Sequence, residues 1–148
     1  MSRPLLDLTL FVDECLGHHD VPGALARAGI QVEVLRDHFA AGTEDATWLA
    51  AVGRLGWVVL TSDKRIRRRN AEMQALLAAN VIAFVLTSGN LSGQAAGLAF
   101  VRAYPRMQKL VRDRVAPFVA AVTAAGSVSL LTPAPRRAGR KKSPTQDP

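Results

Sequence analysis

The segment Trp57-Val-Val-Leu-Thr-Ser-Asp-Lys-Arg-Ile-Arg-Arg-Arg69 decides how the rest of the chain is interpreted. Its apolar run from Trp57 to Leu60 is the pattern of a short strand buried on both faces. The run ends in Thr61, Ser62 and Asp63, and five basic residues follow within the next six. In an open α/β sheet, ligands bind at the carboxyl ends of the strands. Asp63 therefore stands where chemistry is expected, beside a patch that can hold a polyanion.

The sequence around this segment alternates between strand and helix patterns. Strands are expected at residues 8–12, 30–35, 57–60 and 81–86, and a closing hairpin at 118–123 and 127–131. Helices are expected to begin at Val21-Pro22, after Thr43 as N-cap, at Asn70 and after Ser92. The last of these helices is expected to run to about Arg112, with Pro105 kinking or dividing it. This alternation predicts an α/β fold with a mostly parallel sheet and helices on both faces.

Composition predicts one folded domain and a basic tail. The 148 residues, 49% of them hydrophobic, suffice for one domain with a real core, placed at residues 1–132. Residues 133–148 have too little apolar surface to fold alone and are predicted to be disordered. The tail holds five basic residues and one acid, which leaves 14 basic and 11 acidic residues, or +3 of the total +7, in the domain. Charge alone therefore does not establish nucleic-acid binding.

Other sequence features narrow the class of protein. No apolar run approaches the roughly 20 residues of a membrane span, and the N-terminus has no signal-peptide pattern, so a cytoplasmic protein without membrane contact is expected. The single cysteine, Cys15, excludes an internal disulfide and does not support a Cys-based zinc site; a small buried side chain is expected. The adjacent His18 and His19 are expected in a surface turn.

Acidic residues follow two of the predicted strands and open one helix. Asp13 and Glu14 follow the first strand, Glu44 and Asp45 begin a helix, and Asp63 follows the third strand. Right-handed crossovers bring these positions to one edge of the sheet. Crowded carboxylates repel one another, so such a cluster implies bound cations. Mg²⁺ or Mn²⁺ fits best, because these ions prefer oxygen ligands, acidify a bound water and neutralise phosphate charge.

Each of these residues also has a purely structural interpretation. Glu44 or Asp45 can serve only as a helix-start acid, and Glu14 can be a solvated neighbour of Asp13. Asp63 can cap its own backbone in a turn, and the basic run at 64–69 can be a solvated face rather than a phosphate-binding one.

Taken together, these residues resemble the PIN-like domain proteins, and more narrowly those grouped with the VapC-type toxins of toxin–antitoxin pairs. The resemblance extends over nearly all of the chain up to about residue 131. The matching segments are 11–14, 21–22, 37–39, 42–45, 48–49, 56–66, 84–92 and 117–118.

The resemblance implies a Rossmann-like α/β/α sandwich, metal-dependent cleavage of RNA phosphodiesters and, often, homodimers. On the matching positions Asp13, Asp45 and Asp63 would be metal ligands, with Glu14 as an additional ligand or base. Thr61 or Ser62 would hydrogen-bond a ligand, a water or a phosphate. The residues expected to position the RNA backbone are Lys64, Arg65, Arg67 and Arg68.

One departure from the family pattern concerns the fourth acid. PIN nucleases typically carry it close to the third, whereas Lys64 and Arg65 follow Asp63 here and the next acid is Glu72. Whether Glu14, Glu44 or Glu72 completes the acidic site stays open.

The function predicted from these residues is that of an Mg²⁺- or Mn²⁺-dependent endoribonuclease, the toxin of a type II toxin–antitoxin pair with a cognate antitoxin as partner. A first alternative is a catalytically inactive PIN-like module that binds nucleic acid or regulates. A second is a phosphoacceptor receiver domain, with Asp63 as acceptor and Thr87 after the fourth strand. A receiver needs a lysine at the end of a fifth strand, but Lys109 falls in a predicted helix.

Overall fold

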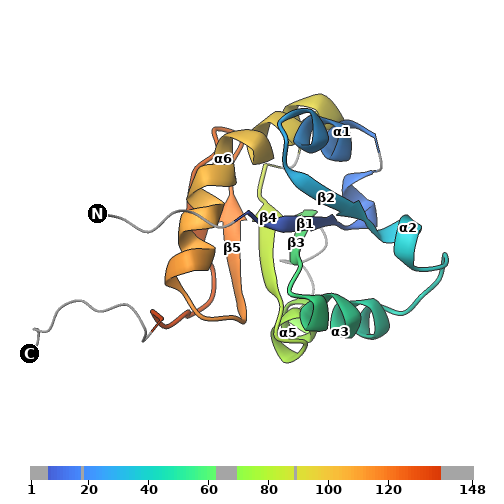
Figure 1. Ribbon diagram of the computed structural model, residues 1–148, viewed down its shortest axis with the longest axis vertical. Helices are drawn as coiled ribbons and strands as arrows, with labels where there is room; N and C mark the ends of the chain where they lie inside the picture. The colour runs from blue at the N-terminus through green and yellow to red at the C-terminus, as the bar shows by residue number, and fades with distance from the viewer. Residues whose placement is uncertain (1–6, 18, 63–69, 89, 138–148) are drawn as a thin grey trace, which may run out of the picture.

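A six-stranded sheet in the order β2-β1-β3-β4-β5-β6 forms the centre of the protein (Figure 1). The computed structural model describes residues 7–17, 19–62, 70–88 and 90–137. The strands are β1 (Thr9–Val12), β2 (Gln31–Val34), β3 (Val58–Ser62), β4 (Ile82–Leu86), β5 (Phe118–Val122) and β6 (Val128–Leu130). β6 runs antiparallel to β5, and all the other pairs are parallel. The predicted mostly parallel sheet is confirmed.

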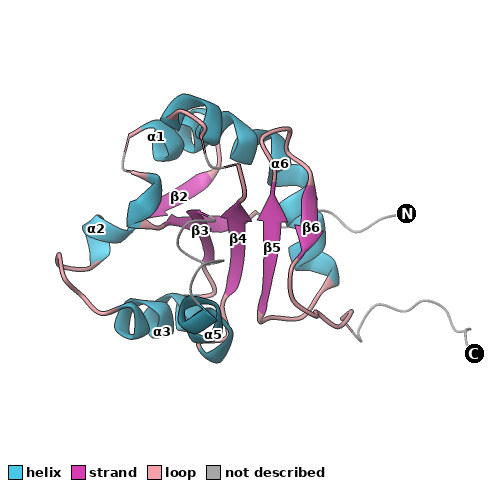
Figure 2. Cartoon of the chain, turned by 180° about the vertical axis from the view of Figure 1, so that it is seen from behind, coloured by secondary structure: helices cyan, strands magenta, loops and turns pink. Residues whose placement is uncertain are grey.

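Helices cover both faces of this sheet (Figure 2). They are η1 (Glu14–Leu16), α1 (Asp20–Arg27), α2 (Leu35–His38), α3 (Asp45–Leu55), α5 (Asn70–Ala78) and α6 (Gly93–Asp113). Buried side chains of α1 and α6 pack on one face, and those of α2, α3 and α5 pack on the other. The predicted α/β/α sandwich is therefore also confirmed. No helix within the described residues is both long and apolar enough to cross a membrane.

Strand alternation sorts the apolar side chains into two cores. Leu10, Val12 and Leu60 belong to the core under α1 and α6, whereas Phe11 and Val59 belong to the core under α3 and α5. Successive side chains of a strand point to opposite faces, so this division follows directly from the sequence order. All five are buried. The same alternation decides which face the polar residues beyond the strands occupy.

The predicted helices and strands are present, with corrections at their ends. The Ser92 side chain accepts a hydrogen bond from the Ala95 N–H (3.1 Å) and caps α6, as expected. α6 continues through Pro105, so the proline does not divide it. Thr43 is not the N-cap of α3: Glu44 occupies that position, and the Thr43 hydroxyl donates to the carbonyl of Ala40.

The short helix α2 was not predicted. Leu35, expected to end a strand, instead begins this helix, and its side chain is buried in the core under α3. Four residues give too short a stretch for a helical period to stand out in the sequence.

The chain packs against the domain beyond the predicted boundary at residue 132. Ala134 is buried, the Val115 N–H donates to the carbonyl of Pro135 (2.9 Å), and Arg114 forms a β-bridge with Arg136. Residues 134–137, which were assigned to the predicted tail, therefore pack against the domain. Residues 138–148 lie outside the described part of the chain.

Candidate functional site at the carboxyl edge of the sheet

Asp13 is a buried carboxylate at the point where β1 ends. Its side chain is 2% exposed, and its backbone N–H donates to the carbonyl of Leu60 in β3 (3.0 Å). The register pairs Val12 with Leu60, so the next residues, Asp13 and Thr61, lie side by side. The expected meeting of the first and third strands at one edge is thus confirmed as far as Thr61.

Thr61 holds the carboxylate of Asp13. Its hydroxyl, 1% exposed, donates a hydrogen bond to Asp13 Oδ2 (2.9 Å). Asp13 is two residues beyond Phe11 and Thr61 two beyond Val59, so alternation assigns both to the face that carries α3 and α5. A carboxylate buried in this way costs free energy unless other groups compensate its charge.

Cys15 adds a thiol to this pair, which the sequence did not predict. Its sulfur donates to Asp13 Oδ2 (3.5 Å), lies 3.3 Å from Thr61 Oγ1 and accepts from the hydroxyl of Ser62 (3.4 Å). Burial of the sulfur raises the pKa of the Cys15 thiol, and the charge of Asp13 raises it further. The expectation of a small buried residue is wrong, because Cys15 as a whole is exposed although its sulfur is turned toward the buried pair.

Asp45 and Glu44 lie at the beginning of α3. Asp45 is the first residue of the helix, and its Oδ1 accepts a hydrogen bond from the Trp48 indole N–H (3.0 Å). Glu44 is exposed at the N-cap and makes no capping hydrogen bond with its side chain. Carboxylates here are favoured by the positive end of the helix dipole, so both residues have a structural role beside any ligand role.

Glu14 has a partner that the sequence did not indicate. It lies in η1 and forms an exposed ion pair with Arg36 of α2. Since α2 was not predicted, neither was this pairing. Any role of Glu14 as a metal ligand or base therefore competes with its ion pair to Arg36.

Part of the predicted acidic site lies outside the described residues. Asp63 is among them, together with the predicted RNA-positioning residues Lys64, Arg65, Arg67 and Arg68. Glu72 belongs to α5, but its side chain is also outside the description. Among the residues that are described, no three acidic, His or Cys side chains gather closely enough to hold a metal ion. The grouping of Asp13, Asp45 and Asp63 stays a prediction.

The donor atoms at this edge suit a hard cation. Asp13 offers a carboxylate and Thr61 and Ser62 offer hydroxyl oxygens, the ligand type that Mg²⁺ and Mn²⁺ prefer. The thiol of Cys15, held in its neutral form by the raised pKa, is a poor ligand for such ions. The residues present therefore fit a magnesium or manganese site that Asp63 would extend.

Two hollows in the described structure lie at the other edge of the sheet. One has a volume of about 480 Å³ and the other about 360 Å³, and Asp7, Leu8 and Thr9, where β1 begins, line both. Neither contains Asp13 or Thr61. The carboxyl edge is the better candidate, because ligands of open parallel sheets bind there.

The fold and this edge define an α/β sandwich with a buried carboxylate where its first and third strands end. A model of the PIN like domain matches residues 8–88, more than half of the chain. The chain therefore belongs to the PIN-like domain family.

The chain is also similar to a mycobacterial protein. The protein named "Putative ribonuclease VapC45" from Mycobacterium tuberculosis is 25% identical over 107 residues, which cover 70% of this chain and 78% of the relative. No solved structure matches.

The receiver-domain alternative requires a lysine at the end of the fifth strand, and Lys109 does not lie there. Lys109 lies in α6, an exposed position on a helix and not the end of the fifth strand. Thr87 follows β4 as expected, but its hydroxyl donates to the carbonyl of Val122 (3.3 Å). The family match and the position of Lys109 together favour the PIN-like interpretation.

Proposed function

We propose that this protein is a ribonuclease that cleaves RNA phosphodiester bonds with Mg²⁺ or Mn²⁺ bound at the carboxyl edge of the sheet. The observation that carries the proposal is the buried carboxylate of Asp13, fixed by Thr61 on the strand that leads to Asp63. Membership of the PIN-like family supports it, as does a relative that bears the name of a ribonuclease.

Asp13, Asp45 and Asp63 are the proposed metal ligands. When bound, the metal supplies charge neutralisation at the phosphate and a more acidic water. Thr61 orients the Asp13 carboxylate through its hydrogen bond. Glu14, Glu44 and Glu72 are candidates for a further acid, and Glu14 must first leave its ion pair with Arg36.

Substrate contact is assigned to the basic run that follows Asp63. Lys64, Arg65, Arg67 and Arg68 carry positive charge next to the proposed metal ligand in sequence, and phosphate contacts of this kind position a nucleic acid without reading its bases. Ser62 is the further candidate for a hydrogen bond to a phosphate or a water.

The biological role proposed is that of the toxin of a type II toxin–antitoxin pair in the cytoplasm. The name of the relative supports this assignment. A cognate antitoxin and a second copy of the chain are the expected protein partners. A small neighbouring gene that encodes a DNA-binding antitoxin would be inexpensive support.

The experiment is cleavage of labelled RNA with Mg²⁺, with Mn²⁺ and with EDTA. Wild type is compared with Asp13→Asn and Asp63→Asn, which keep the side-chain shape and remove the charge. Asp7→Asn is the matched control, since Asp7 is an exposed acid at the opposite edge of the sheet.

We expect metal-dependent cleavage by wild type and by Asp7→Asn, and a loss of roughly 10²-fold or more in the two edge variants, as for removal of a group that stabilises transition-state charge. Equal cleavage by Asp13→Asn would refute the assignment. Tight RNA binding by wild type without any cleavage would instead identify the inactive, RNA-binding form of the module.

A further inference from the structure

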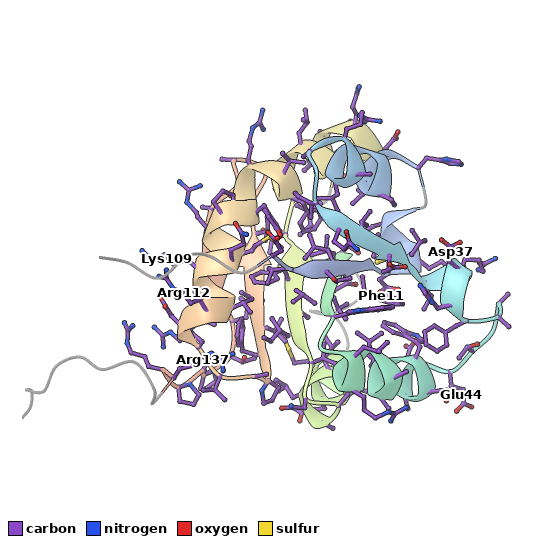
Figure 3. All side chains as sticks on the ribbon, viewed as in Figure 1. Phe11, Asp37, Glu44, Lys109, Arg112 and Arg137 are labelled. Atoms are coloured by element: carbon purple, nitrogen blue, oxygen red, sulfur yellow. The ribbon has the colours of Figure 1, made fainter. Side chains whose placement is uncertain are left out.

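Charge is distributed unevenly between residues 7–62 and residues 100–137. Residues 7–62 contain eight acidic residues and three arginines, a net charge of −5. Residues 100–137 contain seven Arg and Lys residues and one acid, a net charge of +6. Figure 3 shows Lys109, Arg112 and Arg137 on one side of the molecule and Asp37 and Glu44 on the other.

The second half of α6 carries one part of the positive charge. Arg102, Arg106 and Lys109 are exposed and recur four and three residues apart, so they form one stripe along the helix. Arg112 belongs to a different arrangement, because it pairs with the neighbouring Asp113 (2.8 Å). Among the described residues, Arg102, Arg106 and Lys109 take part in no ion pair.

The C-terminal segment adds further cations at the end of the same helix. Arg137 donates through its backbone N–H to the carbonyl of Asp113 (2.9 Å) and through its guanidinium to that of Val111 (3.3 Å). Arg114 donates to the carbonyl of Ala134 (2.8 Å). These bonds fix the segment against the end of α6, and they leave the exposed Arg136 beside it.

We name the set of Arg102, Arg106, Lys109, Arg114, Arg136 and Arg137 the α6 basic surface. Fold stability does not account for all of it. Cations in the last turn of a helix are favoured by the dipole, which accounts for Arg112 and not for the stripe. Arg102 and Arg106 lie earlier in the helix, four residues apart, where like charges repel and destabilise it. A polyanion bound to the surface would offset this repulsion.

We propose that the α6 basic surface binds the phosphate backbone of single-stranded RNA, as a contact separate from the carboxyl edge. This proposal rests on the proposed function only in that RNA, and not another polyanion, is taken as the ligand. The repeated cations along a helix suit a chain of regularly spaced phosphates better than a single anion. The stripe consists of Arg and Lys alone. Tyr104 lies between them in the sequence, but its hydroxyl accepts a hydrogen bond from the Leu8 N–H (2.9 Å), so its ring is not assigned to the stripe. Such a surface should bind RNA without regard to sequence.

The geometry of α6 sets a minimum length for an RNA that uses both contacts. The helix begins after β4, whose carboxyl end is at the edge of Asp13, and ends before β5 at the opposite edge. Arg102 and Lys109 stand ten and seventeen residues after Ser92. At 1.5 Å per residue they lie roughly 15 to 25 Å along the helix. Asp13 is assigned to the face that carries α3 and α5, whereas α6 covers the other face, so an RNA that uses both contacts must be longer than this distance, which alone takes about four to seven stacked nucleotides at roughly 3.4 Å each.

The test is RNA binding by the full chain in EDTA, where no metal-dependent cleavage occurs. A labelled single strand of about 20 nucleotides, longer than a typical site, is titrated at several salt concentrations. The variant Arg106→Gln/Lys109→Gln removes two charges from the α6 basic surface. The matched control, Arg27→Gln/Arg54→Gln, removes two exposed arginines from the ends of α1 and α3.

We expect the surface variant to bind RNA about fivefold or more weakly near 0.1 M salt and to lower the slope of log affinity against log salt by about 1.4, since each single-strand phosphate contact contributes about 0.7. The control should keep the wild-type slope. Equal slopes for wild type and the surface variant would overturn the proposal. So would a variant that loses binding to polyglutamate but keeps RNA, since the surface would then serve an acidic protein. Failure of the nuclease proposal would show as absent cleavage with metal and would leave this result unchanged.

Discussion

At the scale of single residues, the candidate site depends on how a buried carboxylate is held. Asp13 is almost fully buried, and a hydroxyl and a thiol both donate to the same oxygen, Oδ2. Hydrogen bonds to a charged group are stronger than those between neutral groups, so Thr61 should contribute to stability as well as to geometry.

Replacement of Thr61 tests that contribution. Thr61→Val keeps the shape of the side chain and removes the donor, which should lower the free energy of unfolding by about 1.5 to 3 kcal/mol and reduce RNA cleavage. Thr61→Ser keeps the donor and should retain most of both. Urea denaturation and the cleavage assay measure the two effects; a valine variant as stable and active as the serine variant would contradict the role assigned to this hydroxyl.

The pKa of Cys15 gives a prediction about reactivity. Burial of its sulfur and the charge of Asp13 raise the pKa, so the neutral thiol persists to higher pH than in an unfolded chain. Only the thiolate reacts with iodoacetamide, and the chain has one cysteine, so alkylation reports on this group alone. In EDTA, alkylation of the folded protein should begin at higher pH than alkylation of the urea-unfolded protein. The reverse order would show that the sulfur does not face the carboxylate.

At the scale of secondary structure, close packing of α1 on α6 positions the helices over one face of the sheet. A Cβ at Gly97 would approach the Cβ of Ala24 to 2.7 Å and the carbonyl oxygen of Asp20 to 3.0 Å. Gly97 is buried, so only a glycine lets the helices approach this closely.

The substitution Gly97→Ala should therefore destabilise the protein. Overpacking costs about 1 to 3 kcal/mol, which outweighs the gain of up to about 1 kcal/mol in helix propensity. Gly23→Ala is the matched control, because its Cβ would meet only the flexible end of Arg27 at 3.2 Å. Thermal unfolding should place the melting temperature of Gly97→Ala below wild type and that of Gly23→Ala at or above it. A Gly97→Ala protein at least as stable as wild type would show that the helices pack less closely.

The sequence predicts regular elements well and their polar connections poorly. The apolar runs of β1, β3 and β4 and the helical periods of α3 and α6 predict the sheet and both helical layers, because burial fixes these patterns. The parallel strands likewise predict that Asp13 meets the end of β3. The pairing of Glu14 with Arg36 and the approach of Cys15 to Asp13 could not be predicted, because they depend on η1 and α2, which have too few residues for a period.

At the scale of the whole molecule, the packed part of the chain extends further than its composition suggests. Residues 133–137 are rich in proline and arginine, yet they are tied to the end of α6 by main-chain hydrogen bonds and by burial of Ala134. Backbone pairing of this kind does not need an apolar sequence, so hydropathy alone misses it.

Two truncations test this boundary. Removal of residues 138–148 should leave the free energy of unfolding unchanged. Removal of residues 133–148 should lower it, because several hydrogen bonds are lost at about 0.5 to 1.5 kcal/mol each. Urea denaturation compares the two; equal stability would mean that residues 133–137 contribute nothing to the fold.

Asp13, Asp45 and Asp63, which come from three separate places in the sequence, are proposed to bind one divalent cation together. Titration with Mn²⁺, with free Mn²⁺ followed by its electron paramagnetic resonance signal, measures this without reference to activity. Three variants, Asp13→Asn, Asp45→Asn and Asp63→Asn, should each weaken Mn²⁺ binding at least about tenfold, about 1.4 kcal/mol, while Asp7→Asn should bind Mn²⁺ as wild type does. Unchanged Mn²⁺ affinity in Asp13→Asn or in Asp63→Asn would contradict this proposal.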